Sequence, residues 1–208
     1  MALSEAWGPM ASGRLLLRAP VASDLEALHR IQSDPLTQRT RPQPTSREAS
    51  LELLQSWQLH WQRWGYGCWA MSLGGDEGKD LLGFGGLMWQ AVDGRQSLCL
   101  KLWLHPQSWG LGYATEVGEL ALQQAFQELH APSVLALVRP TDLPTRRTLE
   151  RLGMRLKGAL ADVPKQAPSL LFETTPAHRA HLAQSRRQAA ALAEQALSPE
   201  SSFGAYSA

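Results

Sequence analysis

A strand gives way to a helix within the stretch Trp103-Leu104-His105-Pro106-Gln107-Ser108-Trp109-Gly110-Leu111-Gly112-Tyr113-Ala114-Thr115-Glu116. Gly110 and Gly112 let the backbone of the turn come close to a ligand. The helix that follows begins with several unpaired N–H groups, and its dipole favours negative charge. This segment therefore predicts a binding site for an anion that needs no lysine.

The sequence before this turn predicts strands at residues 13–18, 68–73, 82–89 and 97–105, and helices at residues 23–31 and 45–64. Two capping-box patterns, Ser23-x-x-Glu26 and Thr45-x-x-Glu48, open the helices, and Asp34-Pro35 breaks the first. Polar, glycine-bearing turns separate the last three strands, so these strands are expected to form an antiparallel meander.

Two apolar patterns lie within these elements. Alternating leucines from Leu98 to Leu104 predict that one face of the last strand belongs to the core. The stripe Leu54, Trp57, Trp61 and Trp64 recurs at helical spacing. The stripe is either core packing or an aromatic wall for a substrate.

After the turn, the periodicity predicts a helix at residues 113–129 and a parallel strand at residues 133–138. Asp142 is expected to cap a short helix, with Pro144 in its first turn and Gly153 after its end. Strands at residues 154–160 and 169–174 complete the pattern. The fold class is α/β (α+β): a mixed, mostly antiparallel sheet with helices on both faces.

A change of composition at Pro176 divides the chain. We expect an N-terminal tail at residues 1–12, one compact domain at residues 13–175, and an accessory helix with a C-terminal tail at residues 176–208. The accessory helix is expected at residues 177–197. Its resistance to proteolysis would indicate that it docks, and a homodimer is one candidate for the surface on which it does so.

The composition excludes several classes of protein. The formal net charge of +1 draws the chain neither to nucleic acid nor to a membrane. Cys68 and Cys99 lie in apolar segments without metal-ligand spacing, so we expect buried, reduced thiols and no metal. The N-terminus lacks a signal-peptide pattern and no apolar run approaches membrane length, which together predict a cytoplasmic protein.

The order of elements and the residues at the turn resemble the GNAT superfamily of acyl-CoA-dependent N-acetyltransferases, in its ribosomal-protein N-terminal acetyltransferase (Rim-type) branch. The fingerprint of that family, Gln/Arg-x-x-Gly-x-Gly/Ala, is matched by Gln107-x-x-Gly110-x-Gly112, and the branch-typical extension runs to Glu116. The likeness also includes the segments Arg14-Leu15-Leu16-Leu17-Arg18, Ser33-Asp34-Pro35, Gly83-Phe84-Gly85-Gly86-Leu87 and Leu149-Glu150-Arg151-Leu152-Gly153-Met154.

This resemblance implies acetyl-CoA as cosubstrate and a sheet that is splayed at the cofactor site. It implies that the pyrophosphate of coenzyme A lies on the backbone of Gly110, Leu111, Gly112, Tyr113, Ala114 and Thr115. It also implies that Leu104 pairs with the pantetheine arm in the manner of an added strand.

The catalytic residues follow the family pattern less closely. Many relatives have a glutamate base on the central strand, where this chain has Cys99. Thr145 is either the acid that protonates the leaving thiolate or a first-turn helix residue, and Leu149 stands where other members have an acid tyrosine. Asp142 is either a helix cap or a cofactor contact. His105 is either a base or a strand-end residue with a surface hydrogen bond.

We expect an amine acceptor between the segment 34–47, the second helix and the splayed strands. Lys101 is expected to pair with a carboxylate across the sheet and not with the substrate. An N-terminal α-amine is the easier acceptor, because its deprotonation at pH 7 costs about 1 kcal/mol against about 4 to 5 kcal/mol for lysine. A small amine such as an antibiotic or polyamine is the alternative acceptor. A non-catalytic acyl-CoA-binding or partner-binding module is the alternative function.

The segment 34–47 contains three arginines, Arg39, Arg41 and Arg47. These side chains are either solvated or contact an acidic peptide or RNA.

Overall fold

The computed structural model describes residues 10–39, 45–74 and 80–197. The strands are β1 (Met10–Ser12), β2 (Leu15–Arg18), β3 (Cys68–Leu73), β4 (Gly83–Val92), β5 (Arg95–Leu104), β6 (Val134–Val138), β7 (Arg155–Leu160) and β8 (Ser169–Thr174). The helices are α1 (Leu25–Ser33), α2 (Pro35–Gln38), α3 (Arg47–Trp64), α4 (Tyr113–Gln123), α5 (Leu143–Arg151) and α6 (Pro176–Leu197). Arg41, most of the predicted β3–β4 turn, residues 1–9 and residues 198–208 lie outside the described residues.

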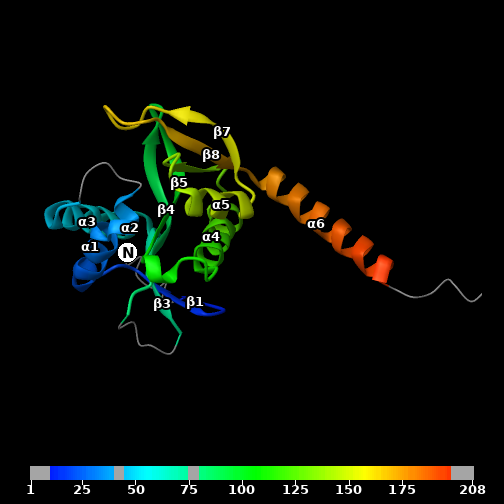
Figure 1. The fold of residues 1–208 in the computed structure, drawn as a ribbon, viewed down its shortest axis with the longest axis horizontal. Coiled ribbons are helices and arrows are strands. Elements are labelled where there is room, and N and C mark those ends of the chain that lie inside the picture. Colours follow the sequence, from blue (N-terminus) through cyan, green and yellow to red (C-terminus); the bar gives the residue numbers. More distant parts are fainter. Residues whose placement is uncertain (1–9, 40–44, 75–79, 198–208) are drawn as a thin grey trace, which may run out of the picture.

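The strands form one sheet in the order β1-β2-β3-β4-β5-β6-β8-β7 (Figure 1). Every neighbouring pair is antiparallel except β5 and β6, which are parallel. These two strands share a single paired position, Cys99 with Leu135, and diverge beyond it. The predicted fold class is confirmed, and the parallel pair opens the sheet at its centre.

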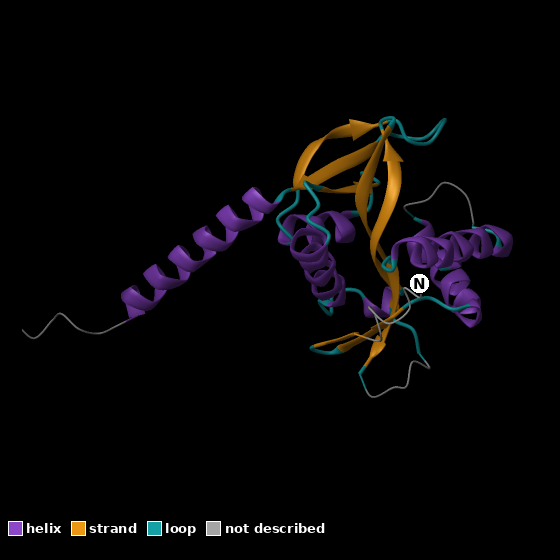
Figure 2. Ribbon diagram, turned by 180° about the vertical axis from the view of Figure 1, so that it is seen from behind, coloured by secondary structure: helices purple, strands orange, loops and turns teal. Residues whose placement is uncertain are grey.

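Helices cover both faces of this sheet, with α4 on one face and α1 and α3 on the other (Figure 2). On one face, Leu98, Leu100 and Leu104 of β5 pack in the same buried cluster as Val117 and Leu122 of α4. On the other face, a second cluster joins residues of β3 and β4 to α1 and α3, namely Cys68, Ala70, Phe84, Leu28 and Trp57. The predicted core face of β5 is therefore confirmed, and it faces α4.

Three helix starts differ from the predictions. α3 is capped by Ser46, whose hydroxyl accepts from the Ala49 N–H at 3.1 Å, so Thr45 is not the cap. Ser23 lies inside a 3-10 turn, η1 (Ala22–Asp24), and α1 begins after it. Asp34, predicted only as a break, caps the short helix α2. A side-chain cap thus forms at α2 and α3, whereas Asp24, at the N-cap position of α1, makes no side-chain cap bond. Backbone direction decides which side chain reaches the free N–H groups.

The aromatic stripe of α3 divides along its length. Leu54 and Trp57 are buried in the core, and the Trp61 indole N–H donates to the Cys68 carbonyl at 2.8 Å. Trp64 is 45% exposed, and its ring contacts that of Trp89. Core packing is therefore the correct interpretation for the first half of the stripe.

The described chain begins with a strand of the sheet and ends with a helix that projects from the domain. β1 pairs with β2, so the sheet begins three residues before the predicted start at residue 13. α6 extends away from the rest of the molecule (Figures 1 and 2). Its first turns contact the body, where Arg179 and Arg186 donate to the carbonyls of Leu152 and Arg151. No helix of the described ranges is both long and apolar enough to cross a membrane.

Candidate active site

A cavity of about 760 Å³ lies where β5 and β6 diverge. Its walls include residues from both faces of the sheet, so the cavity passes through the sheet at the gap. Even-numbered residues of β5 face α4, and odd-numbered ones face α1 and α3. The gap therefore has two sides on which two different molecules can meet.

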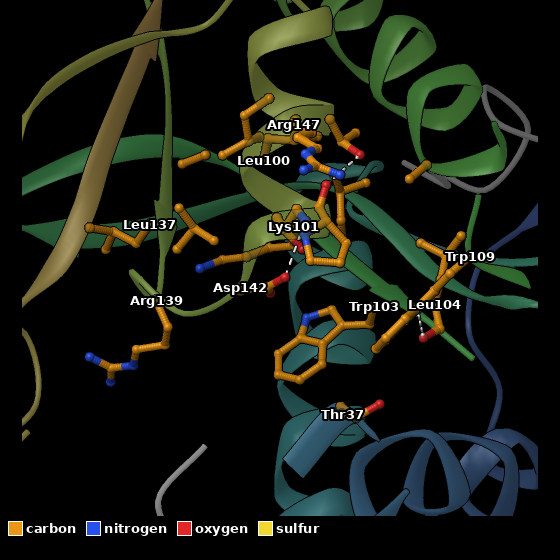
Figure 3. Close-up of a pocket in the computed structure, with 18 of the residues that line it drawn as sticks. Thr37, Leu100, Lys101, Trp103, Leu104, Trp109, Leu137, Arg139, Asp142 and Arg147 are labelled. Atoms are coloured by element: carbon orange, nitrogen blue, oxygen red, sulfur yellow. Dashed lines mark hydrogen bonds between the residues drawn. The ribbon is translucent and has the colours of Figure 1, made fainter. Parts of the chain in front are cut away.

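One side, the turn side, is formed by backbone and small residues. Its lining includes Leu102, Leu104, Gly110, Gly112, Ala114, Thr115, Asp142, Thr145 and Leu149. The other side, the helix side, is formed by side chains from five elements and the segment before α3. Its lining includes Ile31, Thr37, Thr45, Gln90, Lys101, Trp103, Leu137 and Arg139, several of which are labelled in Figure 3.

The turn has the geometry that its glycines predict. Gly110 and Gly112 have φ of 76° and 86°, in the left-handed region that favours glycine. The N–H groups of Thr115 and Glu116 both donate to the Gly112 carbonyl at 3.0 Å. The N–H groups of residues 110–114 have no acceptor within the described part of the chain. Five consecutive free donors at a helix start can bind an anion, and Thr115 could add only its hydroxyl.

A residue that the sequence did not single out braces this turn. Arg14, in the turn between β1 and β2, donates through Nε and Nη2 to the Glu116 carboxylate at 3.1 and 2.9 Å, and through Nη1 to the Leu111 carbonyl at 3.1 Å. Its guanidinium lies 4.5 Å from the centre of the Tyr113 ring. Arg14 and Glu116 both belong to the segments that resemble the GNAT family, but their pairing was not predicted.

At the end of β5, the backbone N–H and C=O groups of Leu104 point toward the gap. The His105 N–H donates to the Leu82 carbonyl at 2.8 Å, and Leu104 is paired with Gly83. In an antiparallel ladder this arrangement directs the N–H and C=O of Leu104 away from β4 and toward the gap. The Trp109 indole N–H donates to that carbonyl at 3.0 Å. The N–H of Leu104 is thus available to an extended ligand.

Asp142 and Thr145 occupy the places that the sequence predicts. Asp142 caps α5, because its Oδ1 accepts from the Thr145 N–H at 3.1 Å. Both residues line the cavity, as does the buried Leu149. In the next turn of α5, the Thr148 hydroxyl donates to the Pro144 carbonyl at 3.1 Å. Thr145 is a first-turn residue of α5 that lines the cavity, and its role as the acid stays a prediction.

Four other predicted site residues lie outside the lining of the cavity. Nδ1 of His105 accepts from the Gln107 N–H at 3.3 Å, and His105 is not among the lining residues. Gln107, Leu111 and Tyr113 likewise do not line the cavity, although the backbone N–H groups of Leu111 and Tyr113 belong to the donor run. These roles stay predictions.

Neither cysteine is suited to nucleophilic or base chemistry. Both are buried and free of disulfides. Burial raises the pKa of the Cys68 thiol to about 12 and raises the pKa of the Cys99 thiol, in each case against the smaller effect of nearby Lys101. A thiol that stays protonated at neutral pH neither attacks a thioester nor accepts a proton from an amine.

Lys101 differs from its prediction. Its ammonium donates to the Gln90 side-chain carbonyl on β4, so its partner is a neutral amide and not a carboxylate. The prediction failed because pairing across β4 and β5 depends on register, and Lys101 pairs with Gly86 while Gln90 lies four residues further along β4. The ammonium extends into the cavity (Figure 3).

The chain is similar to known acetyltransferases in both sequence and structure. The family model described as an acetyltransferase (GNAT) domain matches residues 14–155. An acetyltransferase (GNAT family) from Bacillus anthracis is similar in structure, with TM-score 0.63, 20% identity, and coverage of 81% of this chain and 98% of that one. An acetyltransferase from Agrobacterium tumefaciens str. C58 has TM-score 0.66, 20% identity, and coverage of 84% and 98%. A ribosomal L7/L12 alpha-N-protein acetyltransferase in complex with coenzyme A has TM-score 0.59, 18% identity, and coverage of 80% and 96%.

Proposed function

Because the chain belongs to the GNAT acetyltransferase family, we propose that it transfers an acetyl group from acetyl-CoA directly to a primary amine. The observation that supports this most is the cavity that passes through the sheet between β5 and β6. A cofactor entering from the turn side and an amine entering from the helix side meet in the gap. Holding both reactants in one geometry supplies much of the rate enhancement.

In this proposal the turn binds the pyrophosphate through the N–H groups of residues 110–114, and Thr115 adds its hydroxyl. Each charge-assisted bond of this kind is about twice as strong as a neutral one. Leu104 bonds the pantetheine arm through its N–H, Asp142 contacts the cofactor from the same cavity wall, and Gln107 contacts it from outside the cavity lining. The catalytic unit is residues 13–175, and residues 176–208 are an accessory segment.

The acceptor in this proposal is a protein N-terminal α-amine, in line with the Rim-type pattern of residues 109–116. A weak set of bases favours this class, because an α-amine loses its proton more readily than a lysine does. His105 is the candidate base, and Thr145 is the candidate acid for the leaving thiolate. The acetyl group passes to the amine without an acyl-enzyme, since both thiols stay protonated. An acetyl group trapped on Cys99 during turnover would contradict direct transfer.

A mass-spectrometric assay of acetyl-CoA with a panel of amines tests the proposal. Peptides with a free N-terminus are expected to gain one acetyl group at the α-amine, and their N-terminally blocked, lysine-containing counterparts none. Acetylation of antibiotics or polyamines alone would assign a small-molecule acceptor. No thiol release with any amine would assign a non-catalytic acyl-CoA-binding module.

Substitutions separate the two candidate catalytic residues. Thr145→Val is expected to lower kcat about tenfold or more, with unchanged acetyl-CoA affinity, because general acid catalysis contributes about 10²–10⁴. Thr148→Val is the matched control, since that hydroxyl is already bonded within α5. His105→Gln is expected to lower kcat, with unchanged acetyl-CoA affinity, because it removes the candidate base. An unchanged kcat would exclude His105 as the base.

A further inference from the structure

Lys101 stands out on the helix side of the cavity, because its charge is not balanced there. It is partly buried, and among the described residues it forms no ion pair. Within the described ranges its side-chain ammonium has one hydrogen-bond partner, the Gln90 carboxamide. A cation withdrawn from water without a counter-ion costs free energy, which a bound anion would recover.

The other charged groups of this side neutralise each other. Arg139 donates to Asp162 at 3.3 Å and to the Ala167 carbonyl at 3.0 Å. The second oxygen of Asp162 accepts from the Ser169 hydroxyl at 2.9 Å. Among the described lining residues of the helix side, one positive charge is left, at Lys101; Arg147 and Arg151 also line the cavity, but from α5 on the turn side. One uncompensated charge matches a monoanion better than a phosphate.

The geometry of the pair adds a second donor. Because the Gln90 carbonyl oxygen accepts from Lys101, the amide nitrogen of the same group is left to donate elsewhere. Both residues line the cavity, so the ammonium and the amide can donate to the two oxygens of one carboxylate. In Figure 3 the Lys101 and Arg139 side chains extend toward the same end of the cavity, away from Trp109.

We propose that Lys101, oriented by Gln90, binds a carboxylate of the acceptor, so that the substrate class is amines with a carboxylate near the reacting amine. This inference rests on the proposed function. For a peptide acceptor, it means an acidic side chain close to the free N-terminus. Trp103, on the same face of β5, forms the adjoining apolar wall. A site built to bond a carboxylate rejects the neutral analogue, because its own donors are then left unpaired.

The test uses the full chain and pairs of short peptides that differ only by Asp against Asn, or Glu against Gln, near a free N-terminus. The acidic member is expected to have a kcat/KM about ten- to a hundredfold higher. Lys101→Gln is expected to bring this ratio close to one, chiefly through KM, and Lys101→Arg to keep part of it. Lys157→Gln on β7 is the control, because Lys157 pairs with Glu173 outside the cavity. Equal rates for both peptides, or a ratio that survives Lys101→Gln, would overturn the inference.

Calorimetry with the coenzyme A-loaded protein separates this inference from the proposed function. If neither peptide is acetylated but the acidic one binds more tightly in a manner that depends on Lys101, the carboxylate site stands and the proposed transfer fails. If acetylation occurs while both peptides bind equally, the transfer stands and the carboxylate site fails. Equal binding without acetylation would overturn both.

Discussion

The two sides of the cavity are built in opposite ways. The turn side is built around one continuous segment of chain, residues 102–115, whose backbone N–H groups supply the donors, and Asp142, Thr145 and Leu149 of the α5 region complete its wall. The helix side is assembled from α1, α2, β4, β5 and β6, whose side chains make the site. A backbone site depends on conformation, whereas a side-chain site depends on which residues the fold brings together. The turn side is therefore expected to bind what all family members share, and the helix side what distinguishes this chain.

The largest expected effect tests the turn side. Gly110→Glu places a carboxylate at the donor run and is expected to weaken acetyl-CoA binding about a thousandfold, because juxtaposed like charges cost several kcal/mol. Gly94→Glu is a matched control: Gly94 has φ of 74°, close to the 76° of Gly110, and at both positions nothing lies within 4 Å of an added Cβ. Calorimetry measures both variants. Equal affinities would remove the turn from the proposed cofactor site.

Acetyl-CoA binding on the turn side is expected to be independent of the interactions that hold α1 on the helix side. Arg18 and Asp24 form a two-bond ion pair at 2.7 and 2.8 Å that fixes the start of α1, and the hydrogen bond to Asp24 raises the pKa of Arg18. Asp24→Ala is expected to lower the free energy of unfolding by about 3 kcal/mol, because it leaves an unpaired, partly buried charge. Urea unfolding measures this loss. Acetyl-CoA affinity of the folded variant is expected to stay unchanged, and a parallel loss of affinity would show that the two sides are coupled.

The brace behind the turn has a smaller effect. Arg14→Gln removes three side-chain bonds to Glu116 and Leu111 and is expected to weaken acetyl-CoA binding about fivefold, near 1 kcal/mol. Arg47→Gln is the control, since it breaks a similar exposed pair with Glu26 away from the turn. If both variants bind equally well, Arg14 does not position the donor run.

The smallest effect concerns pH and α3. His60 is buried, with Nδ1 bonded to the Tyr66 carbonyl and Nε2 accepting from the Trp89 N–H. Burial lowers the pKa of His60, against the smaller opposite effect of the Tyr66 carbonyl. The unfolded chain therefore binds a proton at a higher pH than the folded one. The contribution of His60 to the free energy of unfolding is fully present above the unfolded-state pKa of about 6.5. It is lost as the pH falls below that value, by at most about 1 kcal/mol between pH 7 and pH 6.

Urea unfolding at several pH values measures this dependence. His60→Gln is expected to flatten it over that range, at the cost of lower stability at pH 7. His181→Gln, at an exposed position on α6, is expected to leave the dependence unchanged. If the free energy of unfolding of the wild type rises as the pH falls from 7 to 6, the predicted direction of the pH dependence is wrong.

Much of the fold followed from local patterns, and the failures have local reasons too. The strands of the meander were predicted within a few residues because alternation and glycine-bearing turns are encoded next to one another. The cap of α3 was misplaced by one residue, to Thr45 instead of Ser46, since both can cap and only the chain direction chooses. The five-residue π-helical segment after α4 (Gln124–Glu128) had no signal in an otherwise regular helical pattern.

By itself, the sequence determined the turn. Two glycines, a strand before them and a helix after them specify left-handed backbone and free N–H groups without help from the rest of the chain. The tertiary structure alone decided that Arg14 braces that turn from about a hundred residues away, and that Lys101 meets Gln90 and not a carboxylate. Those pairs depend on sheet register and helix packing, which sum weak contacts over the whole domain and leave no mark in either local segment.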